Sequence, residues 1–305
     1  MAKTVDVVII GAGIAGLTAG IYLKRSSLSG VVLEKAAPGG RLLNIHAIDN
    51  YPSESLIPGP KLAEKIVTHA AELGVVPEYG NVQGVQKQGD HFLVATDMDT
   101  YEAKAVIVAT GTTTKTLGVP GEKEFAGRGV SYCATCDGNF FKGKDVALIG
   151  YKDRAIEEAI YLASITRHLY VFAPQPFETT EAHERTLRSF SNVDFFFGAK
   201  LLGIFGEKLV SSIKVALADG SEKSYPVAGV FPLTGEKSST DFLAGLTPEN
   251  KAGFLLTDSQ MATSIPGVFA AGDIVDKKLR QLVTASSDGA LAATAAIAYV
   301  HGLKA

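Results

Sequence analysis

A glycine-rich loop close to the start of the chain is the feature that most constrains its fold. The apolar segment Val5–Ile10 predicts a strand, Gly-Ala-Gly-Ile-Ala-Gly follows at positions 11–16, and a helical pattern then runs to about Arg25. Glycines at this spacing let the backbone turn tightly and approach a pyrophosphate, whose charge then lies among the free N–H groups of the helix amino end. The pattern therefore predicts a Rossmann-like unit that binds a dinucleotide.

An acidic residue stands at the distance that such a site requires. A second predicted strand, Val31–Leu33, ends in Glu34, which follows Gly11 by 23 residues. A carboxylate in this place binds the ribose hydroxyls of an adenine dinucleotide. A glycine loop alone also occurs in tight turns without a ligand, but the strand, the helix and the acid together favour a dinucleotide site.

A second unit of the same kind begins 140 residues after the first. Asp145–Ile149 predicts a strand that Gly150 closes, Arg154–Ile165 has helical character, and Leu169–Phe172 predicts the next strand. This repetition predicts two related α/β domains. The length of 305 residues agrees, because a single core usually stops growing below that size. An alanine-rich helix is expected near the end of the chain, from about Ser286 to Tyr299.

Charge and hydropathy exclude several classes of protein. A net charge of -3 argues against a nucleic-acid partner, which would require a basic excess. The chain has no apolar run near the ~18 residues that a membrane span needs. Its start, Met1–Val5, lacks the charged and apolar regions of a signal peptide. We therefore expect a cytoplasmic protein with neither a nucleic-acid nor a membrane partner.

The only two cysteines lie in one motif, Cys133-Ala134-Thr135-Cys136. Such a pair serves either redox chemistry or half of a metal site. A metal would need further ligands. The six histidines are scattered, with no pair at ligand spacing: His46, His69, His91, His168, His183 and His301. We therefore expect a redox pair and no metal.

The spacing of the two cysteines suits disulfide exchange. Cysteines separated by two residues close a small ring, and a helix amino end next to one of them makes its thiolate a better nucleophile and leaving group. Asp137 follows the pair directly, and one role for it is to cap a helix.

Further motifs follow the first glycine loop in a fixed order. They are Gly39-Gly40-Arg41-Leu42 with Asp49-Asn50-Tyr51-Pro52, then Ala109-Thr110-Gly111, Cys133 to Gly138, Ala271-Gly272-Asp273, and Arg280-Gln281 ahead of the final helix. With the first loop, these six motifs resemble those of the low-molecular-weight thioredoxin reductases. The resemblance covers nearly the whole chain.

The resemblance implies an FAD-dependent disulfide reductase that acts on thioredoxin and forms a homodimer. Asp273 would bind the ribityl chain, and the last helix would cover the flavin ring. The implied FAD contacts are Gly11, Gly13, Ala15, Gly16, Glu34, Gly40, Arg41, Leu42, Asn50, Val82, Thr110, Gly111, Gly272, Asp273, Arg280, Gln281 and Leu282.

The resemblance also implies an architecture of two Rossmann-like, three-layer α/β domains. The FAD domain would be split into residues 1–116 and 241–305, and a central redox domain, residues 117–240, would be inserted between its parts. The central domain would swing about two hinges near Thr113–Leu117 and Thr234–Asp241.

Three residues would carry the chemistry by this resemblance: Cys133, Cys136 and Asp137. Cys136 would be the sulfur that faces the flavin, and Asp137 the acid/base that protonates the departing thiolate. Capping by Asp137 is compatible with that role. Which sulfur attacks the protein substrate stays open.

The second dinucleotide-like unit departs from the family. After its first strand the chain reads Gly150-Tyr151-Lys152-Asp153-Arg154, so Lys152 fills the space that a pyrophosphate needs and Asp153 adds a negative charge. The next strand ends in Ala173-Pro174-Gln175-Pro176, and the next cation, Arg185, lies too far on to grip a 2′-phosphate. Glu157-Glu158-Ala159 still match the family's helix. We expect that the fold is kept and NADPH binding is lost, unless Lys152 and Arg154 still bind phosphate.

This pattern resembles the pyridine-nucleotide-independent branch, which contains ferredoxin-linked flavin thioredoxin reductases and deeply rooted thioredoxin reductases. We therefore expect ferredoxin or another non-pyridine donor to reduce the FAD. Lys277, Lys278 and Arg280 form either a docking patch for an acidic ferredoxin or a plain solvated loop. The alternatives are an NADPH-dependent reductase with an atypical pocket and a flavin redox sensor. The intact Cys-x-x-Cys-Asp motif disfavours the sensor.

Overall fold

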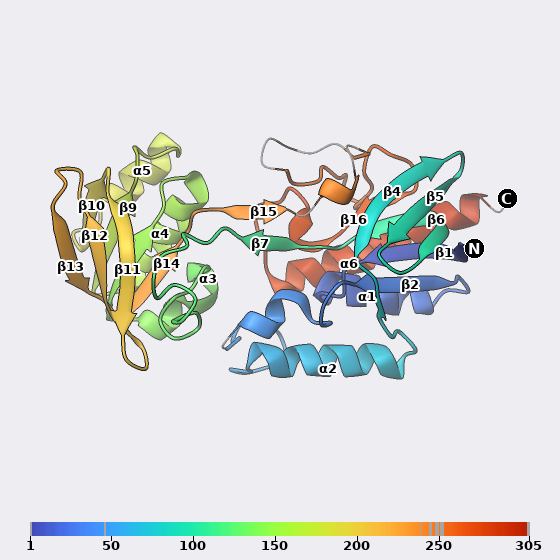
Figure 1. The fold of residues 1–305 in the computed structure, drawn as a ribbon, viewed down its shortest axis with the longest axis horizontal. Helices are drawn as coiled ribbons and strands as arrows, with labels where there is room; N and C mark the ends of the chain where they lie inside the picture. Colours follow the sequence, from blue (N-terminus) through green and yellow to red (C-terminus); the bar gives the residue numbers. More distant parts are fainter. Residues whose placement is uncertain are drawn as a thin grey trace. The chain divides into compact units, whose positions relative to one another are not determined.

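The computed structural model describes residues 2–45, 47–238, 240–243, 246–247, 250 and 253–303. The chain divides into two units (Figure 1). The first unit consists of Met1–His46, Tyr51–Thr113 and Lys237–Ala305, and the second of Ala47–Asn50 and Thr114–Glu236.

The first unit contains a seven-stranded sheet that is parallel at one side and antiparallel at the other. β1 pairs in parallel with β2 and β6, and β6 pairs in parallel with β16. β4, β5 and β6 form an antiparallel meander. The strands are β1 (Lys3–Ile10), β2 (Gly30–Glu34), β3 (Glu78–Tyr79), β4 (Val82–Gln88), β5 (His91–Thr96), β6 (Thr100–Val108) and β16 (Val268–Ala270).

Successive side chains of β1 point to opposite faces of the sheet, and each face has its own hydrophobic core. Val7 and Ile9 pack with α1 (Ile14–Lys24) and α6 (Leu282–Leu303), while Val8 and Ile10 pack with β5 and β6 on the opposite face. Small residues let the two helices approach closely, because a side chain at Gly289 of α6 would meet the carbonyl oxygen of Ala15 of α1 at 2.2 Å. The remaining helical elements are α2 (Gly59–Glu72), η1 (Gly40–Asn44), η3 (Asp241–Leu243) and η4 (Gly272–Ile274).

The second unit has three layers. A parallel sheet in the order β10-β9-β8-β14 lies between helices and an antiparallel sheet in the order β11-β12-β13. Its strands are β8 (Asp145–Ile149), β9 (His168–Ala173), β10 (Val193–Phe197), β11 (Lys200–Gly206), β12 (Val210–Ala216), β13 (Glu222–Pro226) and β14 (Gly229–Pro232). Its helices are α3 (Ala134–Asp137), η2 (Gly138–Phe141), α4 (Asp153–Ile165) and α5 (Glu181–Arg188). The predicted α/β class with Rossmann-like sheets is confirmed.

A two-stranded ribbon of β7 (Thr112–Thr114) and β15 (Glu236–Ser238) connects the two units. The N–H of Lys115 donates to the carbonyl of Gly235 at 3.0 Å, and the Thr234 hydroxyl donates to the carbonyl of Lys115 at 2.7 Å. The chain passes from the first unit into the second after Thr113 and returns after Glu236, whereas the sequence suggested boundaries after residues 116 and 240. Ser239, within the second expected hinge, lies outside the described residues. No helix among the described residues is long and apolar enough to cross a membrane.

Candidate active site

The first glycine loop joins β1 to α1, as its spacing predicted. A side chain at Gly16 would meet the carbonyl oxygen of Gly11 at 1.8 Å, so helix and loop can pack only without one. Gly13, the N-cap of α1, has no described atom within 4 Å of where a side chain would start, and no described side chain caps the helix. Gly13 therefore faces open space at the amino end of α1, where a phosphate can approach the backbone.

The predicted acid is held beside this loop. The Glu34 carboxylate, at the carboxyl end of β2, accepts the N–H of Ala12 at 2.8 Å and the N–H of Ala36 at 3.0 Å. Because the carboxyl ends of parallel strands meet at one edge of a sheet, Glu34 and the glycine loop lie at the same edge. This is the arrangement expected for binding a ribose next to a pyrophosphate.

Further motifs of the first unit meet at this loop. A side chain at Gly40 would lie 3.1 Å from the Cα of Gly13, and one at Gly272 would lie 2.9 Å from the Cβ of Ala15. Gly111, like Gly13, borders open space among the described residues. Segments far apart in sequence thus surround the amino end of α1.

Arg41 ties two of these segments together. Its Nη1 donates to the Thr112 hydroxyl at 3.1 Å and lies 3.4 Å from Oδ2 of Asp273. Asp273 follows β16, so the residue expected at the ribityl chain is brought next to Arg41, another of the implied FAD contacts. These glycines and polar groups fit an extended dinucleotide.

The remaining residues expected to contact FAD lie in different parts of the chain. Leu42 is buried in η1. Val82 is the first residue of β4 and packs against the hydrophobic core that contains Val8 and Ile10. Gln281 immediately precedes Leu282, the first residue of α6. Asn50 belongs to residues 47–50, which group with the second unit and not with the glycine loop.

The basic cluster, for which the sequence left open a docking patch or a solvated loop, is partly directed inward. The amine of Lys277 lies 2.5 Å from Asp288, and both side chains are largely buried. The Arg280 guanidinium stacks over Phe254 at 4.1 Å and donates to the carbonyls of Asp273 and Val275. Two of the three cations therefore stabilise the turn that contains Asp273, because their partners lie on neighbouring elements.

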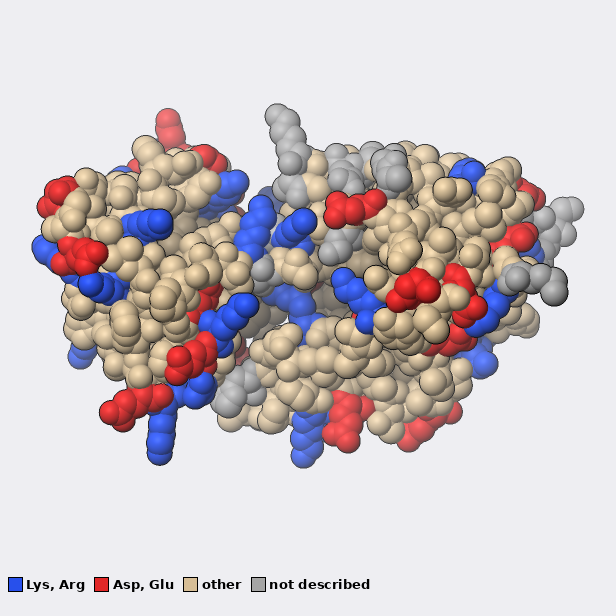
Figure 2. All heavy atoms as spheres, in the orientation of Figure 1, with Lys and Arg blue, Asp and Glu red and all other residues tan. Residues whose placement is uncertain are grey.

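On the face drawn in Figure 2, acidic and basic side chains are interspersed.

The second unit carries the disulfide. Cys133 and Cys136 are bonded, with their Cα atoms 5.3 Å apart. Cys133 is the N-cap of α3, and its sulfur accepts the N–H of Cys136 at 3.2 Å. The short helix therefore holds the pair through the backbone.

Asp137 is the N-cap residue of η2, as one hypothesis expected, but its side chain makes no capping hydrogen bond there. Its carboxylate accepts the hydroxyl of Ser131 at 2.6 Å. The same hydroxyl oxygen accepts the N–H of Cys133 at 3.2 Å. Sequence reasoning missed Ser131, although it lies only two residues before the motif. The buried serine connects the acid to the first cysteine.

The glycine that survives in the second dinucleotide-like unit serves packing. A side chain at Gly150 would meet the Cβ of Ala155 at 2.6 Å and the carbonyl oxygen of Leu233 at 2.9 Å. Lys152 is the N-cap of α4, and its amine lies over the ring of Tyr151 at 5.7 Å. The turn thus places a lysine side chain and its preceding aromatic ring beside the amino end of this helix.

The segment that follows β9 crosses this turn. The N–H of Glu178 donates to the carbonyl of Tyr151 at 2.8 Å. The hydroxyl of Thr179 donates to Asp153, and Nδ1 of His183 lies 2.9 Å from the same carboxylate. The hydrogen bond from Thr179 lowers the pKa of Asp153 most, and that from His183 lowers it further. A carboxylate and the segment that follows β9 therefore lie beside the amino end of α4.

His183 lies near two carboxylates, which sequence spacing did not reveal. One ligand atom each from Asp153, Glu157 and His183 lies within 4.8 Å of the others. Nε2 of the histidine is 3.8 Å from Glu157. The histidine thus lies between two carboxylates at the surface and is hydrogen-bonded to one of them.

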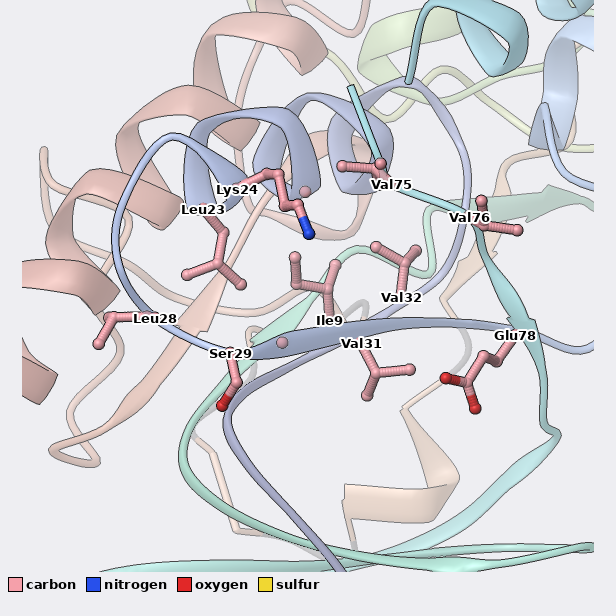
Figure 3. A pocket seen from close by; sticks show the side chains of 13 residues that line it. Ile9, Leu23, Lys24, Leu28, Ser29, Val31, Val32, Val75, Val76 and Glu78 are labelled. Atoms are coloured by element: carbon pink, nitrogen blue, oxygen red, sulfur yellow. The ribbon is translucent and has the colours of Figure 1, made fainter. Parts of the chain in front are cut away.

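A pocket of about 250 Å³ in the first unit lies elsewhere (Figure 3). It is lined by Ser29–Val32 at the start of β2, by Val75 and Val76, and by the side chain of Lys24. Glu34 and the glycine loop lie at the other end of β2. The pocket is therefore separate from the dinucleotide site.

A Rossmann-like unit with this loop and a disulfide on a second such unit define a class of flavin-dependent disulfide oxidoreductases. Residues 5–289 match the family model described as pyridine nucleotide-disulphide oxidoreductase. The chain is 39% identical to a thioredoxin reductase of Listeria innocua, over 99% of this chain and 96% of that protein. The structure of a Streptococcus pyogenes thioredoxin reductase matches with a TM-score of 0.93 and 38% identity, over 99% and 100% of the two chains. The chain therefore belongs to the thioredoxin reductase family, whose members are FAD-binding flavoproteins.

A third similarity concerns the electron donor. The structure of a ferredoxin-flavin thioredoxin reductase from Clostridium acetobutylicum matches with a TM-score of 0.56 and 29% identity, over 99% of both chains. The chain is thus less similar to this protein than to the two reductases above. Overall identity does not favour ferredoxin.

Proposed function

We propose that this flavoprotein reduces thioredoxin with electrons from a donor other than NADPH or NADH, and that ferredoxin is this donor. The hydrogen bond between Glu178 and Tyr151 carries the proposal, because it draws the chain across the amino end of α4. A Rossmann-like unit binds the pyrophosphate of its nucleotide at that place.

The charges near the amino end of α4 also disfavour the binding of NADPH. Asp153 and Glu157 lie in the first turns of α4, and Glu178 lies on the crossing segment. Like charges brought together at an interface cost several kcal/mol, so acids here oppose the phosphates of NADPH. Asp153 stays charged, because its hydrogen bonds from Thr179 and His183 lower its pKa.

The two cations that could offset these acids are placed for other roles. The Nε of Arg154 donates to Glu158 at 3.1 Å, within the same helix. The amine of Lys152 lies against the ring of Tyr151. Residues 173–176, which would bind the 2′-phosphate, contain no cation.

A one-electron protein donor fits a flavoprotein that does not bind a nicotinamide nucleotide. FAD, when bound, supplies the link between single-electron donation and two-electron reduction of a disulfide. The Clostridium acetobutylicum relative, named a ferredoxin-flavin reductase, shares its fold with this chain over 99% of both lengths. The docking surface must involve other residues than Lys277 and Arg280, whose side chains are bonded inward.

The proposed chemistry assigns the first unit to FAD and the second to the disulfide. Two electrons and two protons convert the Cys133–Cys136 disulfide into two thiols. Asp137, hydrogen-bonded to Ser131, would give one proton to the departing thiolate, with Cys136 as the sulfur that faces the flavin. The dithiol then exchanges with the thioredoxin disulfide, so the pair is reoxidised as thioredoxin is reduced.

The proposal includes movement and assembly. The ribbon of β7 and β15 would act as the hinge about which the second unit rotates, since two short strands can absorb such a change. We also expect a homodimer, as the family resemblance implied, and a cytoplasmic location, as the sequence analysis indicated.

A steady-state assay tests this function. Purified protein is supplied with a thioredoxin and, as the only reductant, either reduced ferredoxin or NADPH. Thioredoxin thiols should appear with ferredoxin and not with NADPH. Turnover with NADPH alone would instead support an ordinary NADPH-dependent reductase, and flavin reduction without any thioredoxin thiols would support a redox sensor.

A further inference from the structure

A buried carboxylate contacts the helix that carries the cysteines. Glu158 of α4 is 6% exposed, and its Oε2 accepts the N–H of Ala134 at 2.5 Å. Ala134 is the first residue of α3 and is fully buried against Ile156 and Ala159 of α4. The side chain thus reaches from the degenerate dinucleotide unit to the residue next to Cys133.

Glu158 accepts the first amide of α3, whereas two later amides of this helix bond to Cys133. The N–H of Cys136 donates to the sulfur of Cys133, and the N–H of Asp137 donates to the carbonyl of Cys133. A buried carboxylate is costly unless it is hydrogen-bonded and paired. Glu158 meets both conditions, through Ala134 and through Nε of Arg154 at 3.1 Å.

The charge of Glu158 bears directly on the redox pair. Oxidised, the pair is a neutral disulfide, whereas its reduced form gives up a proton to become a nucleophilic thiolate. A carboxylate one peptide away from Cys133 repels that thiolate and so disfavours the reduced form. A pair whose reduced form is less stable has a lower midpoint potential and passes its electrons on more readily.

We propose that Glu158 is a positioning residue that keeps the Cys133–Cys136 pair strongly reducing, and that Arg154 moderates this effect. The proposal rests on the proposed role of this pair as the electron donor to thioredoxin. The reaction concerned is disulfide plus two electrons and two protons to dithiol, with loss of one proton as the thiolate forms. Glu158 exchanges no electrons or protons in it.

Two substitutions should move the potential in opposite directions. Glu158→Gln keeps an oxygen for the N–H of Ala134 but removes the charge, so reduction becomes easier. Arg154→Met keeps the aliphatic length but removes the compensating cation, so reduction becomes harder. Disruption of packing alone would shift both variants in the same direction. Glu157→Gln is the matched control, because this neighbouring acid of α4 is exposed.

The holoproteins are equilibrated with mixtures of reduced and oxidised dithiothreitol, quenched with acid and alkylated, and the Cys133–Cys136 peptide is measured by mass spectrometry. Glu158→Gln should raise the equilibrium constant for reduction about tenfold, which is about 30 mV for a two-electron couple. Arg154→Met should lower it about threefold. Glu157→Gln should match the wild type.

The outcomes separate this inference from the proposed function, because the titration uses neither ferredoxin nor thioredoxin. An unchanged constant in Glu158→Gln, or a shift of the same sign in Arg154→Met, would overturn the role of Glu158 and leave the reductase proposal standing. If Glu158→Gln does not fold, the sign of the Arg154→Met shift decides.

Discussion

The backbone N–H of Glu178 and the carbonyl oxygen of Tyr151 are joined by a hydrogen bond of 2.8 Å. The bond connects the segment after β9 to the turn between β8 and α4, where the carboxyl ends of two parallel strands meet. Such an edge is the usual ligand site of a doubly wound sheet. Here the segment after β9 is hydrogen-bonded to the turn at this edge, whereas in the first unit no described atom lies within 4 Å of a side chain placed at Gly13 or Gly111.

Restoring glycines alone should not restore nucleotide binding. In the double variant Tyr151→Gly, Lys152→Gly, the carboxylate of Asp153 and the crossing segment at Glu178 persist. We expect NADPH to leave the flavin of this variant oxidised, as in the wild type, when absorbance is followed without oxygen. Tight NADPH binding by the double variant in calorimetry would show that side-chain bulk alone closes the site.

Replacing Cys136 with serine should abolish thioredoxin reduction and spare the flavin. FAD contacts are expected in the first unit, whereas Cys136 lies in the second and its loss removes only the disulfide. Flavin content, released by heat and measured against protein, should stay near one FAD per chain. Appreciable thioredoxin turnover in Cys136→Ser would mean that electrons bypass the pair.

Replacing Gly16 with alanine should cost both stability and flavin. The added Cβ would lie 1.8 Å from the carbonyl oxygen of Gly11, so the loop must move away from α1. Overpacking of this kind costs about 1–3 kcal/mol, and the displaced loop no longer presents its amides to phosphate. Thermal unfolding and flavin content measure the two effects.

Gly302→Ala is the matched control for this change. A side chain at Gly302 of α6 meets no described atom within 4 Å, and alanine favours the helix. This variant should retain its flavin and unfold no earlier than the wild type. Equal flavin loss in Gly16→Ala and Gly302→Ala would argue against the close contact as the cause.

An acid at the start of β8 should give stability that depends on pH. Arg167 donates to the Asp145 carboxylate at 2.7 and 2.5 Å, and this interaction lowers the pKa of Asp145. A lowered folded-state pKa stabilises the protein above the unfolded pKa of about 3.9, and this stability is lost as the pH falls through the folded value. Asp145→Asn should therefore unfold at a lower temperature than the wild type at pH 7.

Thermal scans from pH 7 down to pH 3 check this sign. The difference between wild type and Asp145→Asn should stay constant above pH 5 and shrink below about pH 4, as the wild-type carboxyl takes up its proton. A difference that grows toward acid pH would contradict the assignment of this stability to the charged carboxylate.

Much of the fold follows from local sequence patterns. The apolar segment Val5–Ile10, the loop at 11–16 and the acid at Glu34 are separated by short stretches of chain, so their geometry depends on neighbours in sequence. The same holds for the repeated unit at Asp145 and for the helix α6, which extends four residues beyond its expected bounds at each end. Packing of α6 on α1 stabilises turns that propensity alone would leave frayed.

Contacts between distant segments could not be predicted in this way. Lys277 and Arg280 looked like a surface patch, because sequence does not show that Asp288 and Phe254 lie beside them. The reach of Glu158 to Ala134 depends on how α4 packs against α3, 24 residues away in sequence.

The most direct test of the central claim mixes the oxidised protein with millimolar NADPH or NADH under anaerobic conditions and follows the flavin absorbance in a stopped-flow instrument. Dithionite serves as the positive control, and reduced ferredoxin is the proposed donor. We predict that dithionite and ferredoxin bleach the flavin while both nicotinamide nucleotides leave it oxidised, because in the proposed account Asp153 and the segment at Glu178 oppose the phosphates at the amino end of α4. Rapid bleaching by NADPH would contradict the account and make the protein an NADPH-dependent thioredoxin reductase.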